Sequence, residues 1–128
     1  MSNQPLTMRP YTMAIQVMSL ERACSFYRDK LGLTCAYLDR TLRFMELLLP
    51  GHEQRFTLAE LRQGDTFRPC RFQGPCPIFM SEDIEGDRTE LERRGVPVGP
   101  ITDFGGIFAF SITDPDGNEC AVAQLMQD

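Results

Sequence analysis

The same order of sequence patterns occurs twice in this chain, with the second copy 64 residues after the first. A shift by that distance places Thr12 on Cys76, and it aligns LAEL at residues 58–61 with VAQL at residues 122–125. Few residues are identical between the halves, so the repeat is one of structural elements and not of copied side chains. The chain is therefore predicted to fold as two modules of the same architecture.

The first half predicts one helix among four strands. Ser19 precedes a stretch with apolar residues at helical spacing, and Gly32 follows it, as expected for a helix with a serine N-cap and a glycine after its end. Strand-like patterns between turn residues lie at residues 11–17, 33–39, 42–49 and 55–61.

The second half repeats this order after a linker rich in glycine and proline. Asp83 and Gly95 bracket a helix predicted over residues 84–94, and Asp-Pro-Asp-Gly at residues 114–117 forms a turn before the last strand. Strands are predicted at 76–81, 96–102, 107–113 and 120–125. The expected organisation is a lead-in (1–10), a first module (11–62), a linker (63–75) and a second module (76–128), together forming one domain.

Two βαβββ modules in tandem define an α+β fold with a concave surface. A helix can cover one face of each small sheet, and the other two faces must then pack together or curve around a ligand. We expect a curved, cup-shaped mixed sheet with the helices on the outside. Such a duplicated half-barrel predicts a cleft.

Charge and composition exclude several classes of partner. The 18 acidic and 13 basic residues give a net charge of −5, which argues against nucleic acid as a main partner. No apolar run approaches the ~18 residues of a membrane span, and the first ten residues lack the apolar core of a signal peptide. With five cysteines, an odd number, we expect a cytoplasmic protein with reduced thiols and no contact with membranes.

Two motifs at matching places in the halves resemble a known family. The first is VMSLERACSFYRDKLGL at residues 17–33, which contains Phe26 and Tyr27, and the second is DPDGN at residues 114–118. Together with the repeat, they make the chain similar to the vicinal oxygen chelate superfamily, the fold of glyoxalase I, bleomycin-resistance proteins and extradiol dioxygenases. Both motifs are interpreted as scaffold: the aromatic residues anchor the helix, and DPDGN shapes a turn.

The resemblance implies where a metal ion would be held. Metal-dependent members bind one divalent ion through His, Glu or Gln near the starts of the first and fifth strands and within the fourth and eighth. Those positions correspond here to Thr12, Cys76, Thr57 and Ala121, which are not a ligand set for such an ion. We therefore predict no metal and no other cofactor.

A non-standard metal site is the alternative. A constellation of Gln16, Glu46 and Glu60 would require a shift of one residue in the predicted fourth strand, which would turn Glu60 inward. With such a site the protein would be a metal-dependent lyase, isomerase or dioxygenase of the same superfamily. His52 is the only histidine and lies in a predicted turn, so a Ser-His-Asp hydrolase is not expected.

The leading hypothesis is a binding protein that resembles the bleomycin-resistance branch. Small, apolar and a few polar side chains at inward-facing positions would hold a small hydrophobic or aromatic molecule. The residues predicted to line this pocket are Thr12, Ala14, Gln16, Thr57, Cys76, Ile78, Met80, Phe108 and Ala121. The resemblance further implies a homodimer. A third reading is a degenerate copy that serves as a partner or regulatory module.

Overall fold

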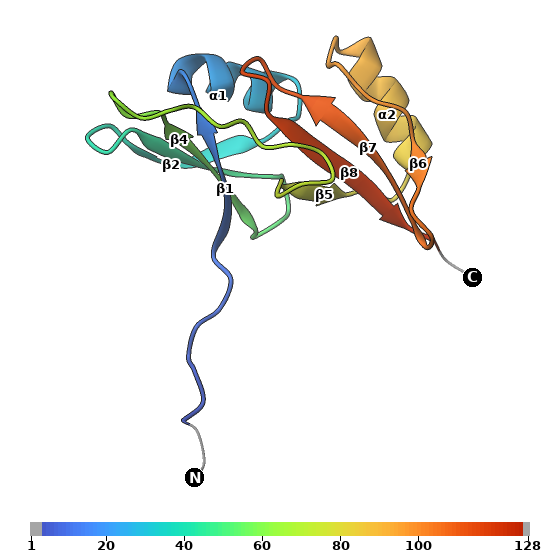
Figure 1. Ribbon diagram of the computed structural model, residues 1–128, viewed down its shortest axis with the longest axis horizontal. Coiled ribbons are helices and arrows are strands. Elements are labelled where there is room, and N and C mark those ends of the chain that lie inside the picture. The colour runs from blue at the N-terminus through green and yellow to red at the C-terminus, as the bar shows by residue number, and fades with distance from the viewer. Residues whose placement is uncertain (1–3, 127–128) are drawn as a thin grey trace.

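The computed structural model describes residues 4–126, and it contains two four-stranded sheets and two helices (Figure 1). The sheets have the strand orders β1-β4-β3-β2 and β5-β8-β7-β6. The elements of the first half are β1 Thr12–Val17, α1 Leu20–Asp29, β2 Thr34–Asp39, β3 Phe44–Leu48 and β4 Arg55–Glu60. Those of the second half are β5 Ile78–Met80, α2 Ile84–Arg93, β6 Thr102–Asp103, β7 Ile107–Thr113 and β8 Glu119–Leu125.

Strand pairing confirms the internal repeat. In the first sheet β1 runs parallel to β4 with Ala14 opposite Thr57, and in the second sheet β5 runs parallel to β8 with Ile78 opposite Ala121. Both partners have moved by the same 64 residues, so the register of the central pair is preserved between the modules. The α+β fold of tandem βαβββ modules is confirmed, and its curved surface is made from two hydrogen-bonded sheets.

Both helices begin at the predicted caps. The Ser19 hydroxyl accepts a hydrogen bond from the Arg22 amide at 3.3 Å, and the Asp83 carboxylate accepts one from the Gly86 amide at 3.1 Å. Gly95 follows α2 with a φ of 84°, in the left-handed region that glycine adopts without steric cost.

A second contact at each helix start also repeats. The Glu60 carboxylate at the end of β4 accepts a hydrogen bond from the Leu20 amide at 2.9 Å. The Gln124 side-chain carbonyl near the end of β8 accepts one from the Ile84 amide at 3.0 Å. In each module, therefore, the last strand satisfies one of the free N–H groups at the helix N-terminus and fixes the helix against its sheet.

The predicted strand over residues 96–102 is mostly irregular. Only Thr102–Asp103 pairs as a strand, and Val98 makes an isolated bridge to Ile112. Pro97 and Pro100 have no backbone N–H to donate to a ladder, which explains the interruption.

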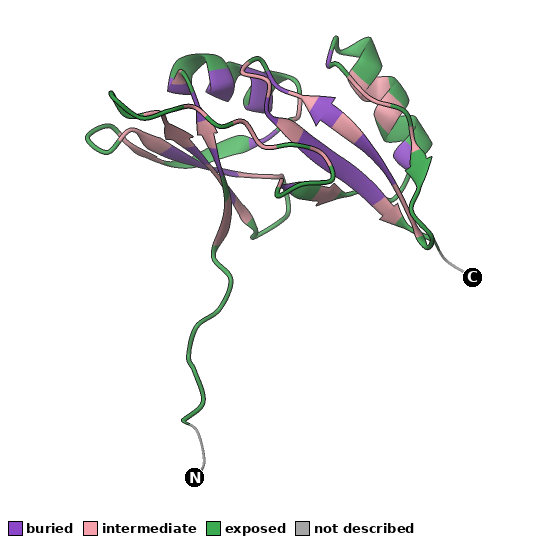
Figure 2. Ribbon diagram, in the orientation of Figure 1, coloured by how far each residue is buried: buried purple, intermediate pink, exposed green. Residues whose placement is uncertain are grey.

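One core runs through both modules. The buried Tyr27 ring lies 5.0 Å from the Phe56 ring, and Phe56 lies 5.5 Å from Phe79 of the second module. Figure 2 shows buried residues along β7 and β8 and on the side of α1 that faces the sheets. Within residues 4–126, no helix has the length and apolar character needed to span a bilayer.

Candidate functional site

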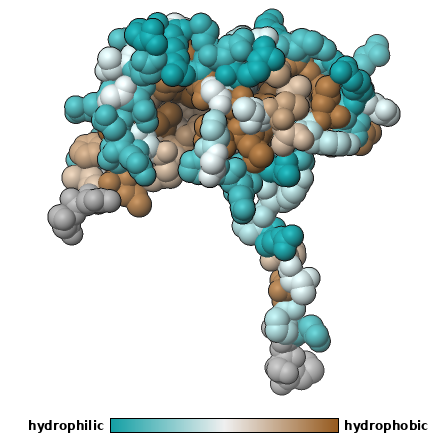
Figure 3. All heavy atoms as spheres, turned by 180° about the vertical axis from the view of Figure 1, so that it is seen from behind, coloured by the Kyte–Doolittle hydropathy of each residue, from teal (hydrophilic) through white to brown (hydrophobic). Residues whose placement is uncertain are grey.

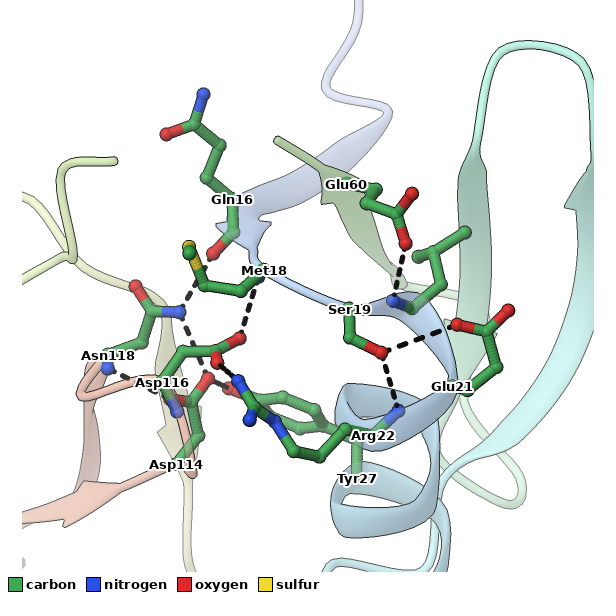
Figure 4. A network of polar contacts seen from close by, with 11 residues as sticks. Gln16, Met18, Ser19, Glu21, Arg22, Tyr27, Glu60, Asp114, Asp116 and Asn118 are labelled. Atoms are coloured by element: carbon green, nitrogen blue, oxygen red, sulfur yellow. Dashed lines mark hydrogen bonds and ion pairs between the residues drawn. The ribbon is translucent and has the colours of Figure 1, made fainter. Parts of the chain in front are cut away.

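The two family-like motifs meet in a buried polar network between the modules (Figure 4). The Tyr27 hydroxyl donates to the Asp114 carboxylate at 2.8 Å, and burial raises the pKa of this tyrosine. The Asn118 side-chain amide donates to the Gln16 carbonyl on β1 at 2.8 Å and to Asp114 at 3.0 Å. The motifs thus hold β1, α1 and the turn before β8 together, which agrees with their predicted scaffold role.

The same network reaches the surface through Asp116. Its carboxylate accepts a hydrogen bond from the Met18 amide at 2.8 Å and forms an ion pair with Arg22 (Figure 4). Sequence reasoning treated residues 114–118 only as a turn. The contact with Tyr27 was missed because 87 residues separate the partners and nothing local indicates the pairing.

The predicted pocket residues of the first module share the face of the sheet that lies away from α1. Ile15 and Leu58 point into the core, so the alternating residues Ala14, Gln16 and Thr57 point to the other side. On this side the hydroxyl groups of Thr12 and Thr57 lie 2.7 Å apart and share a hydrogen bond.

The second module presents the equivalent face. Ile78 and Met80 of β5 are exposed by 53% and 60%, and Ile78 pairs with the small residue Ala121. The two modules meet at a hollow of about 300 Å³, to which Ala14 and Cys76 both contribute. The structure therefore brings these two predicted pocket residues together. The complete lining is Met13, Ala14, Cys70, Pro75, Cys76 and Pro77.

Phe108 does not join this face. It pairs with Gln124, whose side chain bonds the start of α2, so both residues lie on the helix side of the second sheet. Phe108 lines a separate surface hollow there together with Ile84 and Ile101. The sequence could not decide this point, since a shift of one residue moves a strand side chain to the opposite face.

Glu46 is the buried carboxylate of the binding face. It lies opposite Thr57 in the β3–β4 pair and is only 8% exposed. Its two oxygens accept hydrogen bonds from the Tyr11 hydroxyl at 2.9 and 2.7 Å, and Arg55 lies 3.3 Å away. The hydrogen bond to Glu46 raises the pKa of Tyr11. The negative charge of Glu46 is thus already matched within the protein.

Glu60 lies on the opposite side of the sheet from Glu46. Its carboxylate bonds the Leu20 amide at the start of α1 and pairs with Arg43 at 2.9 Å, and the hydrogen bonds from Arg43 lower the pKa of Glu60. The alternative constellation of Gln16, Glu46 and Glu60 is therefore not assembled at one point. Arg43 and the helix start account for Glu60 without a metal.

The residues present do not fit the divalent ion that this fold holds in its metal-dependent members. Across residues 4–126, no three His, Cys, Asp or Glu side chains are grouped so that they could share an ion. At the positions carried over from the resemblance, Thr12 and Thr57 bond each other, Ala121 has no donor atom, and burial raises the pKa of the Cys76 thiol. No step of a mechanism is derived through a metal here.

A further hollow of about 280 Å³ lies on the helix side, between α2 and the first module. Leu31, Leu49 and Leu91 contribute to its apolar wall, and a Glu90–Arg94 ion pair stands at its edge. Figure 3 shows apolar residues gathered in a depression across the middle of the molecule. Sequence analysis did not find this hollow because its lining comes from several separate elements.

Comparison with known proteins places the chain in a family. The model of the Glyoxalase/Bleomycin resistance protein/Dioxygenase superfamily matches residues 10–122, so the chain belongs to this superfamily. Among curated proteins, the comparison finds no significant match.

Solved structures with the same fold cover nearly the whole chain. TnmS3, described as an antibiotic binding protein from Streptomyces sp. CB03234, has a TM-score of 0.81 at 18% identity and covers 95% of this chain and 100% of its own. A superfamily member from Sphaerobacter thermophilus has a TM-score of 0.76 at 26% identity, covering 93% and 99%. An integron cassette protein from the Halifax Harbour sewage outfall metagenome has a TM-score of 0.77 at 24% identity, covering 90% and 97%.

Proposed function

We propose that this protein binds a small hydrophobic or aromatic molecule on the sheet faces that lie away from its helices, without a resident metal ion. The observation that carries the proposal is the hollow shared by Ala14 and Cys76, where the equivalent faces of the two modules meet. The antibiotic-binding description of TnmS3, which has the same fold, supports a binding function for this class of ligand.

The chemistry of the face suits a flat organic molecule. Ala14 and Ala121 leave room above the strands, while Ile78 and Met80 offer exposed apolar surface. Burying about 200 Å² of an aromatic ligand at ~25 cal/mol per Å² contributes roughly 5 kcal/mol before the entropy cost of association. The paired hydroxyl groups at the start of β1 and within β4 would orient the ligand's polar atoms.

We also propose that the protein works as a homodimer in the cytoplasm, where its five free cysteines would stay reduced. Two leading-segment side chains, Leu6 and Met8, are exposed by 78% and 81%. Figure 1 shows this segment extending away from both sheets. Exposed apolar side chains on a projecting segment are available to pack against a second copy. Light scattering after size-exclusion chromatography should give twice the mass of the chain, and a monomer mass would contradict this part of the proposal.

A thermal-shift screen with aromatic and cationic drugs tests the binding function. A ligand at 100 times its dissociation constant should raise the free energy of unfolding by about 2.7 kcal/mol. If no member of a diverse panel shifts the melting temperature, the small-molecule proposal fails and a role as a partner module is favoured.

Metal analysis separates this proposal from the enzymatic alternative, for which buried Glu46 on the binding face is the one favourable observation. The purified protein should hold no stoichiometric ion before or after incubation with Zn, Ni, Mn or Fe salts. One equivalent of bound metal, lost in Glu46→Gln and retained in Glu85→Gln on exposed α2 surface, would favour the metal-dependent lyase, isomerase or dioxygenase.

A further inference from the structure

Two thiols of the linker and the start of the second module lie at one hollow. Cys70 and Cys76 are both half-buried, and both line the 300 Å³ hollow beside Ala14. They bound the sequence CRFQGPC, whose spacing does not match a zinc knuckle. Neither thiol has a part in the ligand-binding proposal beyond forming a wall.

The backbone holds both ends of this loop against β8. The Glu119 amide donates to the Cys70 carbonyl at 2.9 Å, and the Ala121 amide donates to the Pro77 carbonyl at 2.9 Å. Residues two apart on a strand are separated by roughly 7 Å, so the two ends of the loop are held at about that distance. Cys76 directly precedes Pro77, which places it within the range of α-carbon separations that a disulfide spans.

The intervening turn keeps the loop closed on itself. The Gly74 amide donates to the Arg71 carbonyl at 2.9 Å, and Gln73 has a φ of 70°, so the chain reverses between the two cysteines. Because the ends are already fixed and the turn is already made, joining the thiols orders little additional chain.

The two thiols differ in reactivity in a way that suits an attacking and a resolving cysteine. Hydrogen bonding with the Cys120 thiol lowers the pKa of Cys70, whereas burial raises the pKa of Cys76. Cys70 is therefore the thiol more readily converted to the nucleophilic thiolate.

We propose that Cys70 and Cys76 form a reversible disulfide when the protein meets a hydroperoxide. The Cys70 thiolate attacks one peroxide oxygen, the O–O bond breaks, and Cys70 becomes a sulfenic acid as the alcohol or water leaves. The Cys76 sulfur then attacks the Cys70 sulfur and a water molecule leaves with the proton of the Cys76 thiol. Two thiols are oxidised by two electrons and one peroxide is reduced. A dithiol reductant reverses the reaction by exchange.

Peptide mapping of the intact protein tests this directly. The full-length protein is treated with hydrogen peroxide, its remaining thiols are alkylated, and it is digested with trypsin without reduction. Cleavage after Arg62, Arg71 and Arg88 puts Cys70 on peptide 63–71 and Cys76 on peptide 72–88. The expected product is these two peptides joined, with free thiols falling from five to about three per chain.

Variants separate the pairing from general oxidation. Cys70→Ser and Cys76→Ser should each abolish the joined product, and Cys76→Ser should leave a sulfenic acid at Cys70 that dimedone traps. Cys35→Ser removes an exposed thiol on β2 and should leave the joined product unchanged. A link from Cys70 to Cys120, or peptides 63–71 and 72–88 that remain unjoined in the wild-type protein, would overturn the proposal even if a variant fails to fold.

Discussion

Replacing Tyr27 with Phe should destabilise the protein by about 2 kcal/mol. The substitution removes one hydroxyl group and leaves the ring contacts with Phe26 and Phe56 in place. That hydroxyl is buried and donates to Asp114 at 2.8 Å. A hydrogen bond to a charged group contributes roughly 1.5–3 kcal/mol, and the carboxylate stays buried when its donor is lost.

The expected loss is not larger because Asp114 keeps other donors. One carboxylate oxygen still accepts from the Asn118 side chain at 3.0 Å, and the other accepts from the Asp116 and Asn118 amides at 2.8 and 2.9 Å. The charge is therefore weakened in its solvation and not left unpaired. This sets the expected cost near the middle of the range for a single charged hydrogen bond.

Urea unfolding measures the effect, with Tyr37→Phe as the matched control. The Tyr37 hydroxyl is exposed and lies 3.3 Å from Asp39, so its removal should change the free energy of unfolding by less than about 0.5 kcal/mol. For a slope of about 2 kcal/mol per molar urea, Tyr27→Phe should lower the midpoint by roughly 1 M. Equal midpoints for the two variants would refute a stabilising role for the network between the motifs.

Three further substitutions test other contacts. Asn118→Ala should cost about 3 kcal/mol in urea unfolding, because it removes a buried amide that bonds β1, the linker and the turn before β8; a cost below about 1 kcal/mol would show that these bonds contribute little. In Glu60→Gln the helix contact can persist while the charge that pairs with Arg43 is lost. Because the folded-state pKa of Glu60 is lowered, its contribution is complete above its ordinary value of 4.5 and is lost as the pH falls through the lowered pKa. The stability difference from wild type should therefore disappear in acid, and a difference that persists there would contradict the charge-based explanation. Ala14→Trp should fill the hollow and reduce ligand affinity at least tenfold with the melting temperature of the free protein nearly unchanged, whereas Ala36→Trp on exposed β2 should not affect affinity; equal affinities in calorimetry would mean that the site lies elsewhere.

The fold could be predicted from the sequence because its signals are local and occur twice. Ser19 and Asp83 mark helix starts, Gly32 and Gly95 mark helix ends, and the equal spacing indicates duplication. Strand lengths were less well predicted, since backbone pairing depends on donors that proline removes, as in residues 96–102.

The site was only partly predictable, because the face that a strand residue occupies depends on register. The assignment held for Ala14 and Cys76, which share a hollow, and failed to place Phe108, whose strand pairs in a different phase. Partners such as Arg43 for Glu60 and Arg55 for Glu46 were not predictable, since ion pairs across strands leave no sequence pattern.

Mapping a bound ligand by ¹H–¹⁵N NMR tests the central claim most directly. A compound that stabilises the protein in the thermal screen is titrated into labelled, metal-free protein. The largest amide shifts should cluster around Ala14, Ile78 and Ala121, where the open faces of the two modules meet. Shifts concentrated instead on Leu31, Leu49 and Leu91 would place the ligand between α2 and the first module and contradict the proposed site.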